Sequence, residues 1–257
     1  MTALVRTDHP TDLVAEPDHQ NRPKITVVIA ARNEAENLER LLAEIAAVLK
    51  GNIPYEVVVV DDGSDDDTQA VLAILQGRYS NLVTRHHPSS CGQSAGIRTA
   101  ILAASGSLIA TIDGDGQNDP ADLPLLIQAF EDRPAGVGIV IGWRQKRNDT
   151  WRKRRASRIA NGIRARILHD ATPDTGCGLK VFTREAFLNL PYFDHMHRFL
   201  PALMLREGLR SVSVPVRHRA RIAGQSKYGV WDRALVGVVD MLGVLWLQRR
   251  RRLPRKD

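Results

Sequence analysis

Two aspartates separated by one glycine, Asp113-Gly114-Asp115, directly follow an apolar run at residues 108–112. Alternate side chains of an extended segment point to the same side, so both carboxylates can reach one cation. Oxygen ligands of this kind suit Mg²⁺ or Mn²⁺, which usually bridge to the phosphates of a substrate. An isolated Asp-Gly-Asp is usually a polar turn, but its place at the end of a predicted strand favours a metal site.

A second acidic cluster, Asp61-Asp62-Gly63-Ser64, follows another apolar run at 56–60. A carboxylate there can accept hydrogen bonds from the ribose or base of a nucleotide. Ser64 and the aspartates 65–67 are also typical of the first turn of a helix. We therefore expect Asp61 to contact a ligand and Asp65 to Asp67 to begin a helix. No Walker A motif and no G-x-G-x-x-G after the first strand is present, which argues against a P-loop kinase and a dinucleotide dehydrogenase.

The elements that must position these clusters alternate between strand and helix. Apolar β-branched runs predict strands at 25–30, 56–60, 81–84, 108–112 and 138–141. Apolar residues at helical spacing predict a helix that Asn33 caps with Glu36 and that ends at Gly51. Further helices are predicted after residue 64, over 94–104, and from the Asp119-Pro120 pair to Phe130.

This alternation predicts an α/β fold, a mostly parallel sheet with helices on both faces. Ligands bind such sheets beyond the carboxyl ends of the strands. The polar clusters 31–34, 61–64 and 113–115 all follow strand ends and should converge there.

Composition and charge narrow the class of protein. The 257 residues are 43% hydrophobic and 25% charged, which excludes a disordered or fibrous chain. Residues 1–23 lack the apolar core of a signal peptide and predict a disordered arm. The net charge of +7 is uneven: an acidic half is followed by a basic segment, 143–166, and a basic tail. This asymmetry points to anionic ligands or a membrane surface.

The cysteines and histidines offer little chemistry. Cys91 and Cys177 cannot form a disulfide framework, so we expect a reducing compartment and two plain buried thiols. His86, His87, His195 and His197 have no neighbours in the sequence that complete a metal site, so we expect them to be solvated or structural.

Seven short motifs occur in order between residues 24 and 230. They are Ala30-Ala31-Arg32-Asn33-Glu34, Val60-Asp61-Asp62-Gly63-Ser64, Asp113-Gly114-Asp115 with Gln117, Gly142-Trp143-Arg144, Ser157-Arg158-x-x-Asn161, Asp174-Thr175-Gly176-Cys177-Gly178-Leu179-Lys180 and Gly224-Gln225-Ser226-Lys227-Tyr228. Together they resemble the family 2 glycosyltransferases of GT-A fold, and in particular the polyprenyl-phosphate sugar synthases, the branch that includes dolichol-phosphate mannosyltransferase. Ala30 and Arg32 replace a proline and a tyrosine of the family, so the nucleobase stays open.

The resemblance implies a GT-A domain over residues 24–229 and an inverting transfer of a sugar from a UDP- or GDP-sugar to a polyprenyl phosphate. The product would be a lipid-linked sugar donor for cell-envelope glycans. Mg²⁺ or Mn²⁺ would be held by Asp113, Asp115 and Gln117, which with Arg144 would be catalytic. The nucleotide-sugar would contact Ala30, Arg32, Asn33, Glu34, Asp61, Asp62, Asp113, Arg221 and Lys227. The acceptor phosphate would contact Arg144, Lys153 and Ser157, although relatives have an arginine at the position of Lys153.

The chemistry of that acceptor agrees with the basic segment. A phosphate monoester has a second pKa of about 6, so it is mostly ionised near pH 7 and needs no protein base. It needs cations that hold it in line with the sugar, and segment 143–166 is rich in arginine and lysine.

The C-terminal segment, 230–257, contains an apolar run of 14 residues, Ala234 to Leu247, interrupted by Asp240. Spanning a bilayer takes about 20 residues, and a run that is apolar all round should be buried. Trp231, Trp246 and the basic tail favour a helix lying on an anionic membrane surface, which would place the protein at the cytoplasmic face of the inner membrane. A core helix with a solvated tail is the alternative; a small integral-membrane partner or a homo-oligomer is also compatible.

Two other functions stay open. A family 2 enzyme could use a glycan or another hydroxyl acceptor, which would require a general base near the sugar. A nucleic-acid-binding module could use segment 143–166 and the tail, but it leaves the aspartate pairs unexplained, and aromatic residues for base stacking make up only 5% of the chain. The family resemblance is compatible with mannose, glucose and a hexuronic acid as the sugar.

Overall fold

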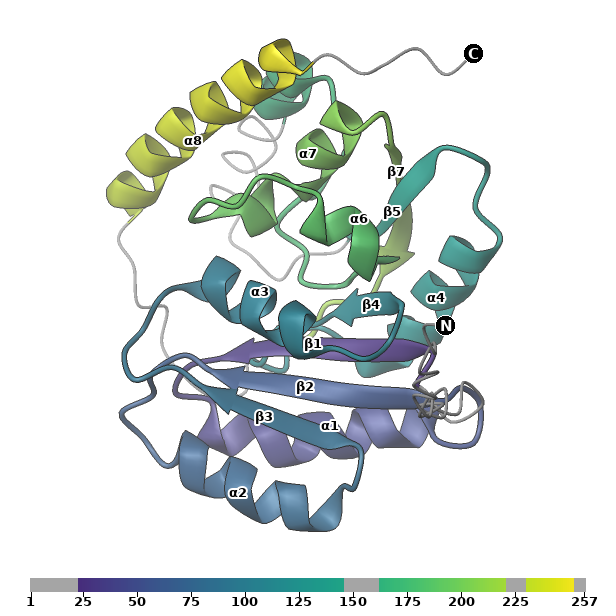
Figure 1. Cartoon of the computed structure of the whole chain (residues 1–257), viewed down its shortest axis with the longest axis vertical. Helices are drawn as coiled ribbons and strands as arrows, with labels where there is room; N and C mark the ends of the chain where they lie inside the picture. The colour runs from purple at the N-terminus through teal and green to yellow at the C-terminus, as the bar shows by residue number, and fades with distance from the viewer. Residues whose placement is uncertain (1–22, 146–161, 221–229, 252–257) are drawn as a thin grey trace, which may run out of the picture.

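The computed structural model describes residues 23–145, 162–220 and 230–251. Its seven-stranded sheet has the order β3-β2-β1-β4-β6-β5-β7 (Figure 1). Four strands are parallel neighbours: β1 (Ile25–Ala31), β2 (Tyr55–Asp61), β3 (Leu82–His86) and β4 (Leu108–Thr111). Strand β6 (Lys180–Thr183) runs antiparallel between β4 and β5 (Val137–Arg144), and β7 (Arg210–Val216) is parallel to β5. The predicted mostly parallel sheet is confirmed.

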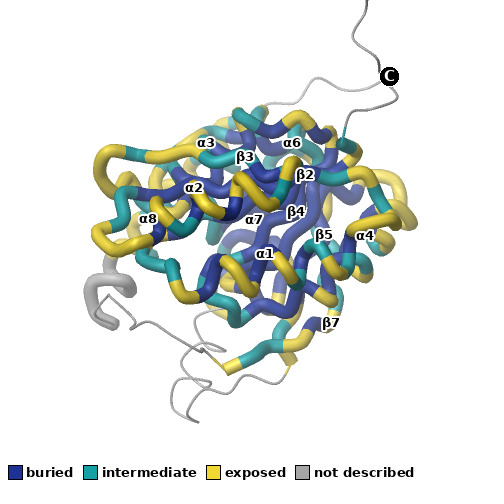
Figure 2. Tube along the Cα trace, turned by 90° about the horizontal axis from the view of Figure 1, so that it is seen from below, coloured by how far each residue is buried: buried dark blue, intermediate teal, exposed yellow. Residues whose placement is uncertain are grey.

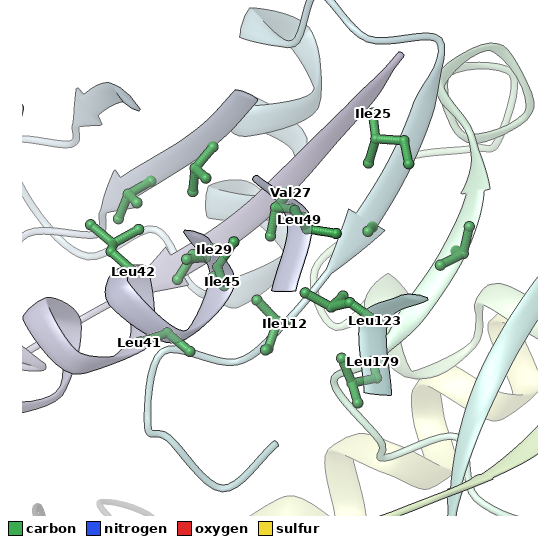
Figure 3. Close-up of a cluster of buried hydrophobic side chains, with 14 of the residues drawn as sticks. Ile25, Val27, Ile29, Leu41, Leu42, Ile45, Leu49, Ile112, Leu123 and Leu179 are labelled. Carbon is green, nitrogen blue, oxygen red and sulfur yellow. The ribbon is translucent and has the colours of Figure 1, made fainter. Parts of the chain in front are cut away.

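The central strands are apolar at nearly every position because both faces of the sheet are covered. Ile25, Val27 and Ile29 of β1 point to one face, and Val28 points to the other. On the first face lie α1 (Ala35–Leu49), α2 (Thr68–Arg78) and α4 (Leu123–Glu131), and Figure 3 shows the side chains of α1 packed against β1. On the other lie α3 (Gln93–Ala103), α6 (Arg184–Leu188) and α7 (Leu200–Arg206). Figure 2 shows buried residues following the strands through the middle of the molecule.

The start of α1 differs from the prediction. Asn33 does not cap the helix: its φ is +57°, the helix begins at Ala35, and the N-cap position, Glu34, makes no side-chain cap. The Asn33 side chain instead bonds Asp65 of the loop after β2. Asp119 does act as a cap, accepting from the Ala121 N–H at 3.0 Å, but it starts a short 3₁₀ turn, Pro120–Asp122, that precedes α4.

The C-terminal helix α8 (Val230–Arg250) packs against α7 at the periphery of the molecule (Figure 1). Val244 is fully buried, and Gln248 Nε2 donates to the carbonyl oxygens of Leu168 and Ala202 at 3.1 and 3.0 Å. The expectation that this apolar run is buried is correct for one face only, because the opposite face is exposed. Among the described helices, none combines the length and the apolar composition needed to cross a membrane.

Candidate active site

The three polar clusters predicted to converge do meet at the carboxyl ends of β1, β2 and β4. The Asp62 N–H donates to the Ala31 carbonyl at 2.8 Å, and the Asn33 N–H donates to Ser64 Oγ at 2.9 Å. A Cβ on Gly114 would lie 3.5 Å from the side chains of both Ala31 and Glu34, so the third loop packs on the first. Parallel strands bring residues far apart in the sequence to one edge of the sheet.

The buried Asp61 organises the loop after β2. Its Oδ1 accepts from the N–H and hydroxyl of Ser64, and its Oδ2 lies 2.9 Å from His86 Nδ1. Asp66, two residues before α2, accepts from the Thr68 N–H at 2.9 Å, so the prediction that this acidic run begins a helix is confirmed.

Asp62 holds the loop that connects β3 to α3. Its carboxylate oxygens accept from the N–H groups of Cys91 and Gly92, from Ser90 Oγ and from His87, at 2.7–2.9 Å. Burial alone would raise the pKa of Asp62, but these hydrogen bonds, led by that from His87, hold the pKa below its usual range.

Cys91, predicted to be buried, is exposed; only Cys177 is buried, and burial raises the pKa of its thiol to about 11. Cys91 lies at the surface because its loop uses the backbone N–H, not the side chain, to bind Asp62. Ligand atoms of Asp62, His87 and Cys91 lie within 4.8 Å of one another. The Asp62 oxygens and both His87 nitrogens are already hydrogen-bonded, so this cluster is structural, as expected for His87.

Asp113 lines a cleft of about 370 Å³, and Asp115 lies two residues further along the same loop. Asp113 Oδ1 accepts from Gln93 Nε2 at 2.9 Å, and Asp115 Oδ1 accepts from the Gln117 N–H at 3.1 Å. Desolvation raises the pKa of Asp113 and the negative charge of Asp115 adds to the rise, while Lys180 and Arg144 oppose it. A divalent cation would relieve this repulsion, and two carboxylates with the amide of Gln117 form an oxygen donor set that fits Mg²⁺ or Mn²⁺.

The cleft is also lined by Arg144, at the end of β5. Its Nε and one Nη donate to the two carboxylate oxygens of Asp174 at 2.7 and 2.8 Å. The side chains are only 11% and 6% exposed. Burial opposes the charge of the Arg144 guanidinium, but the bond to Asp174 outweighs it and raises the arginine pKa. The ion pair therefore fixes a cationic, planar group at the wall.

The sequence analysis gave no role in the site to several residues that line the cleft, among them Gln93, Lys180 and His197. Lys180 is buried and donates to the Cys177 carbonyl, and burial lowers the pKa of its ammonium. His197 Nδ1 lies 2.7 Å from Ser94 Oγ. Lys180 ends a motif that the sequence did display, whereas Gln93 and His197 left no local signal.

The other predicted site residues are placed as follows. Ala30 lines a small cavity beside Asp113, Arg32 is exposed, and Glu34 Oε2 accepts from Asn37 at 2.6 Å. Lys153, Ser157, Arg221 and Lys227 lie outside the described residues. Arg219, two residues before Arg221, is bound to the loop that follows Asp115: its N–H donates to the Gln117 carbonyl at 2.9 Å and its guanidinium to Asp119 at 2.7 Å.

The Glycosyl transferase family 2 profile matches residues 26–190. The chain belongs to glycosyl transferase family 2. The undecaprenyl-phosphate 4-deoxy-4-formamido-L-arabinose transferase of Sodalis glossinidius is 33% identical over 209 residues, 80% of this chain, which spans only 63% of the length of that relative. The dodecaprenyl-phosphate galacturonate synthase of Rhizobium johnstonii is 32% identical over a region that covers 90% of this chain and 69% of the length of that synthase.

Solved structures confirm the GT-A-like fold of this family 2 glycosyltransferase. The mannosyltransferase PcManGT from Pyrobaculum calidifontis, in complex with GDP-Man and Mn²⁺, superposes with a TM-score of 0.67 at 22% identity, over 91% of this chain and 66% of that one. The glucosyl-3-phosphoglycerate synthase of Mycobacterium tuberculosis, in complex with Mn²⁺, UDP-glucose and glycerol 3-phosphate, has a TM-score of 0.63 at 20% identity, over 88% and 80% of the two chains.

Gly178 should be intolerant of any side chain in this family 2 glycosyltransferase. A Cβ there would lie 2.3 Å from Asp113 Oδ2 and 2.5 Å from Asn118 Oδ1, so the Asp113 carboxylate would have to move. We expect Gly178→Ala to lower kcat/KM for sugar transfer by roughly 10- to 100-fold. Gly77→Ala is the matched control, since its Cβ meets nothing within 4 Å. Equal activity of the two variants would contradict this account of the site.

His197 should make the stability of this glycosyltransferase depend on pH. Burial lowers the pKa of His197 well below 6.5, and the charges of Lys180 and Arg198 lower it further. Below pH 6.5 the unfolded chain therefore binds a proton at this histidine that the folded chain does not. The unfolding free energy then decreases as the pH is lowered, until the lowered pKa of the folded state is reached. Denaturant titrations at several pH values give the unfolding free energy as a function of pH. We expect this free energy to change more steeply with pH in the wild type than in His197→Gln, by up to about 1.4 kcal/mol per pH unit. Equal pH dependence of the unfolding free energy in the wild type and in His197→Gln would exclude this role of His197.

Proposed function

We propose that this family 2 glycosyltransferase transfers a sugar, with inversion at the anomeric carbon, from a UDP- or GDP-sugar to a polyprenyl phosphate at the cytoplasmic face of a membrane. The observation that carries the proposal is one cleft lined by both the Asp113 carboxylate and the buried cation Arg144, with the negative charge of Asp115 acting on Asp113. The relatives named for undecaprenyl and dodecaprenyl phosphate support the acceptor class.

On the donor side, Asp113, Asp115 and Gln117 would hold a divalent cation that neutralises the diphosphate leaving group. The loops 31–34 and 61–66, tied to each other through Asn33, form the adjoining edge where the nucleoside is proposed to lie. Arg217 and Arg219 bind Asp119 and Asp122, which lie between the proposed metal ligands and α4, so the segment that leads to Arg221 and Lys227 begins beside the proposed diphosphate site.

On the acceptor side, a phosphate monoester supplies its own ionised nucleophile near pH 7. The chain has to orient this group and exclude water. Asp174 fixes the Arg144 guanidinium through two hydrogen bonds, which gives a planar, preorganised partner for phosphate oxygens. Preorganised charge of this kind costs little reorganisation during the reaction.

The test is a transfer assay with the full chain, Mg²⁺ or Mn²⁺, a short-chain polyprenyl phosphate and a panel of UDP- and GDP-sugars. A lipid-linked product from one donor, lost on adding EDTA, is the expected result, and NMR of the product reports the anomeric configuration. Unphosphorylated polyprenol is the matched control acceptor. Transfer to polyprenol or to glycerol 3-phosphate, with none to the lipid phosphate, would replace the acceptor proposed here with a hydroxyl acceptor.

A further inference from the structure

The outward face of α8 is apolar and has no protein partner among the described residues. Val238, Val239, Leu242 and Trp246 are exposed by 51%, 68%, 57% and 58%, and their spacing places them on one side of the helix. We call these four residues the outer face of α8. Other large exposed apolar side chains, such as Ile74 of α2, Leu102 of α3 and Leu125 of α4, lie singly on different elements. A cluster on one helix is the feature that marks an interaction surface.

The opposite face of α8 fixes the helix to the domain. Val244 is buried, Met241, Leu245 and Leu247 pack against the same core cluster, and Gln248 bonds two backbone carbonyls. The outer face therefore cannot turn inward without losing these contacts. Its exposure is a property of the folded domain.

The two faces of α8 also differ in charge: the acidic side chain faces the domain, and exposed arginines follow the outer face. Asp240, the one acidic residue between 236 and 251, lies on the inward side, where its Oδ2 is 3.3 Å from His195 Nδ1. Arg249 and Arg250 are exposed beyond Trp246, and the Arg250 guanidinium carbon lies 5.7 Å from the centroid of the Trp246 ring. The sequence continues with Arg252, Arg255 and Lys256. An apolar face with a tryptophan and a cationic end is complementary to the acyl and headgroup layers of an anionic bilayer.

We propose that the outer face of α8 docks on an anionic lipid surface, with Leu242 and Trp246 entering the headgroup boundary and Arg249 and Arg250 contacting lipid phosphates. The helix would lie in the plane of the membrane. The inference is independent of the sugar-transfer reaction, because it uses no residue of the cleft.

Helix α8 also contacts the elements that line the cleft. Asp240 of α8 contacts His195, which immediately precedes the turn Met196–Arg198, and His197 and Arg198 of that turn line the cleft. Helix α8 also packs on α7, which follows this turn directly. Helix α8 is therefore joined through direct contacts to the turn that lines the cleft.

The experiment measures sedimentation of the full chain with vesicles of phosphatidylcholine alone and of phosphatidylcholine with phosphatidylglycerol. We expect binding to the anionic vesicles, reduced by at least about tenfold in Leu242→Ser/Trp246→Ser because the apolar contact is lost. The double variant Arg249→Gln/Arg250→Gln should bind anionic vesicles about tenfold or more weakly than the wild type, with no such loss on phosphatidylcholine alone. Binding of the wild type to anionic vesicles should weaken as salt is added. The matched control is Ile74→Ser/Leu125→Ser, which removes exposed apolar residues elsewhere and should bind as the wild type does.

Two further readouts separate this proposal from its rivals. Trp246 emission should shift to the blue on binding anionic vesicles, a shift missing from Trp246→Phe. The proposal would be overturned if the wild type did not bind anionic vesicles, or if Leu242→Ser/Trp246→Ser bound them as strongly as the wild type does. A dimer in light scattering that this double variant dissociates, without vesicle binding by the wild type, would assign the outer face to a second copy. Vesicle binding needs neither sugar donor nor acceptor, so its failure would leave the proposed reaction untouched.

Discussion

Asp115→Asn should reduce sugar transfer by roughly 10²- to 10³-fold or more while the protein stays folded. The substitution keeps the size of the side chain and its ability to accept from the Gln117 N–H, but it removes one of the two negative charges that would hold the cation. The measurement is kcat/KM across a Mn²⁺ titration, together with thermal unfolding with and without Mn²⁺ and nucleoside diphosphate. The wild type should gain thermal stability from these ligands, and the variant should gain much less.

Asp132→Asn is the control for that experiment, because Asp132 is an exposed acid at the end of α4, where its carboxylate accepts from Gln128 Nε2 of the same helix. It should leave both transfer and the ligand-dependent stabilisation unchanged. Normal turnover by Asp115→Asn would show that the acidic pair at the end of β4 does not bind the ion, and the donor side of the proposed mechanism would have to be rebuilt.

Asp174→Ala should cost the fold about 3–5 kcal/mol of unfolding free energy, since it leaves the buried Arg144 guanidinium without its carboxylate. Transfer should fall by roughly 100-fold, because the guanidinium loses its fixed orientation. Denaturant titration gives the first quantity and steady-state kinetics the second. Glu131→Ala removes a partner from the exposed Lys24–Glu131 pair and should change stability by less than about 1 kcal/mol.

The double variant Arg144→Met/Asp174→Ala separates structure from chemistry. Removing both charges eliminates the unpaired buried cation, so much of the lost stability should return. Transfer should not return, because the cation at the wall of the cleft is gone. If the double variant recovered both, Arg144 would be a structural residue and the acceptor phosphate would have to be held elsewhere.

The first half of the fold could be predicted because its signals are local. Strands β1, β2, β4 and β5 contain continuous apolar, mostly β-branched runs, and the helices between β1 and β4 are long enough to show a helical period. The acidic clusters follow these strands directly, which is why Asp61, Asp113 and Asp115 could be assigned to one edge of the sheet from the sequence.

The second half could not be predicted in the same way because its elements are short. Strand β6 has four residues, α6 has five and α7 has seven, all below the window in which a period can be read. Strand β7 alternates polar and apolar residues and contains Pro215, which is typical of the edge position that it occupies. His197 reaches the cleft from the short turn Met196–Arg198 that precedes α7, so its place depends on tertiary packing that no local pattern encodes.

The insertion of β6 between β4 and β5 has a consequence for synthesis on the ribosome. The neighbours β3, β2, β1 and β4 come from one continuous stretch of chain, so they can pair as soon as that stretch emerges. The outer edge of β4 then stays without its native partner until residues 180–183 follow, which takes several seconds at roughly 5–20 residues per second. A nascent chain stalled in that interval presents an unpaired parallel-strand edge, the kind of surface that chaperones shield and that pairs with other chains. Synthesis of this interval is therefore the step at which this fold is most exposed to aggregation.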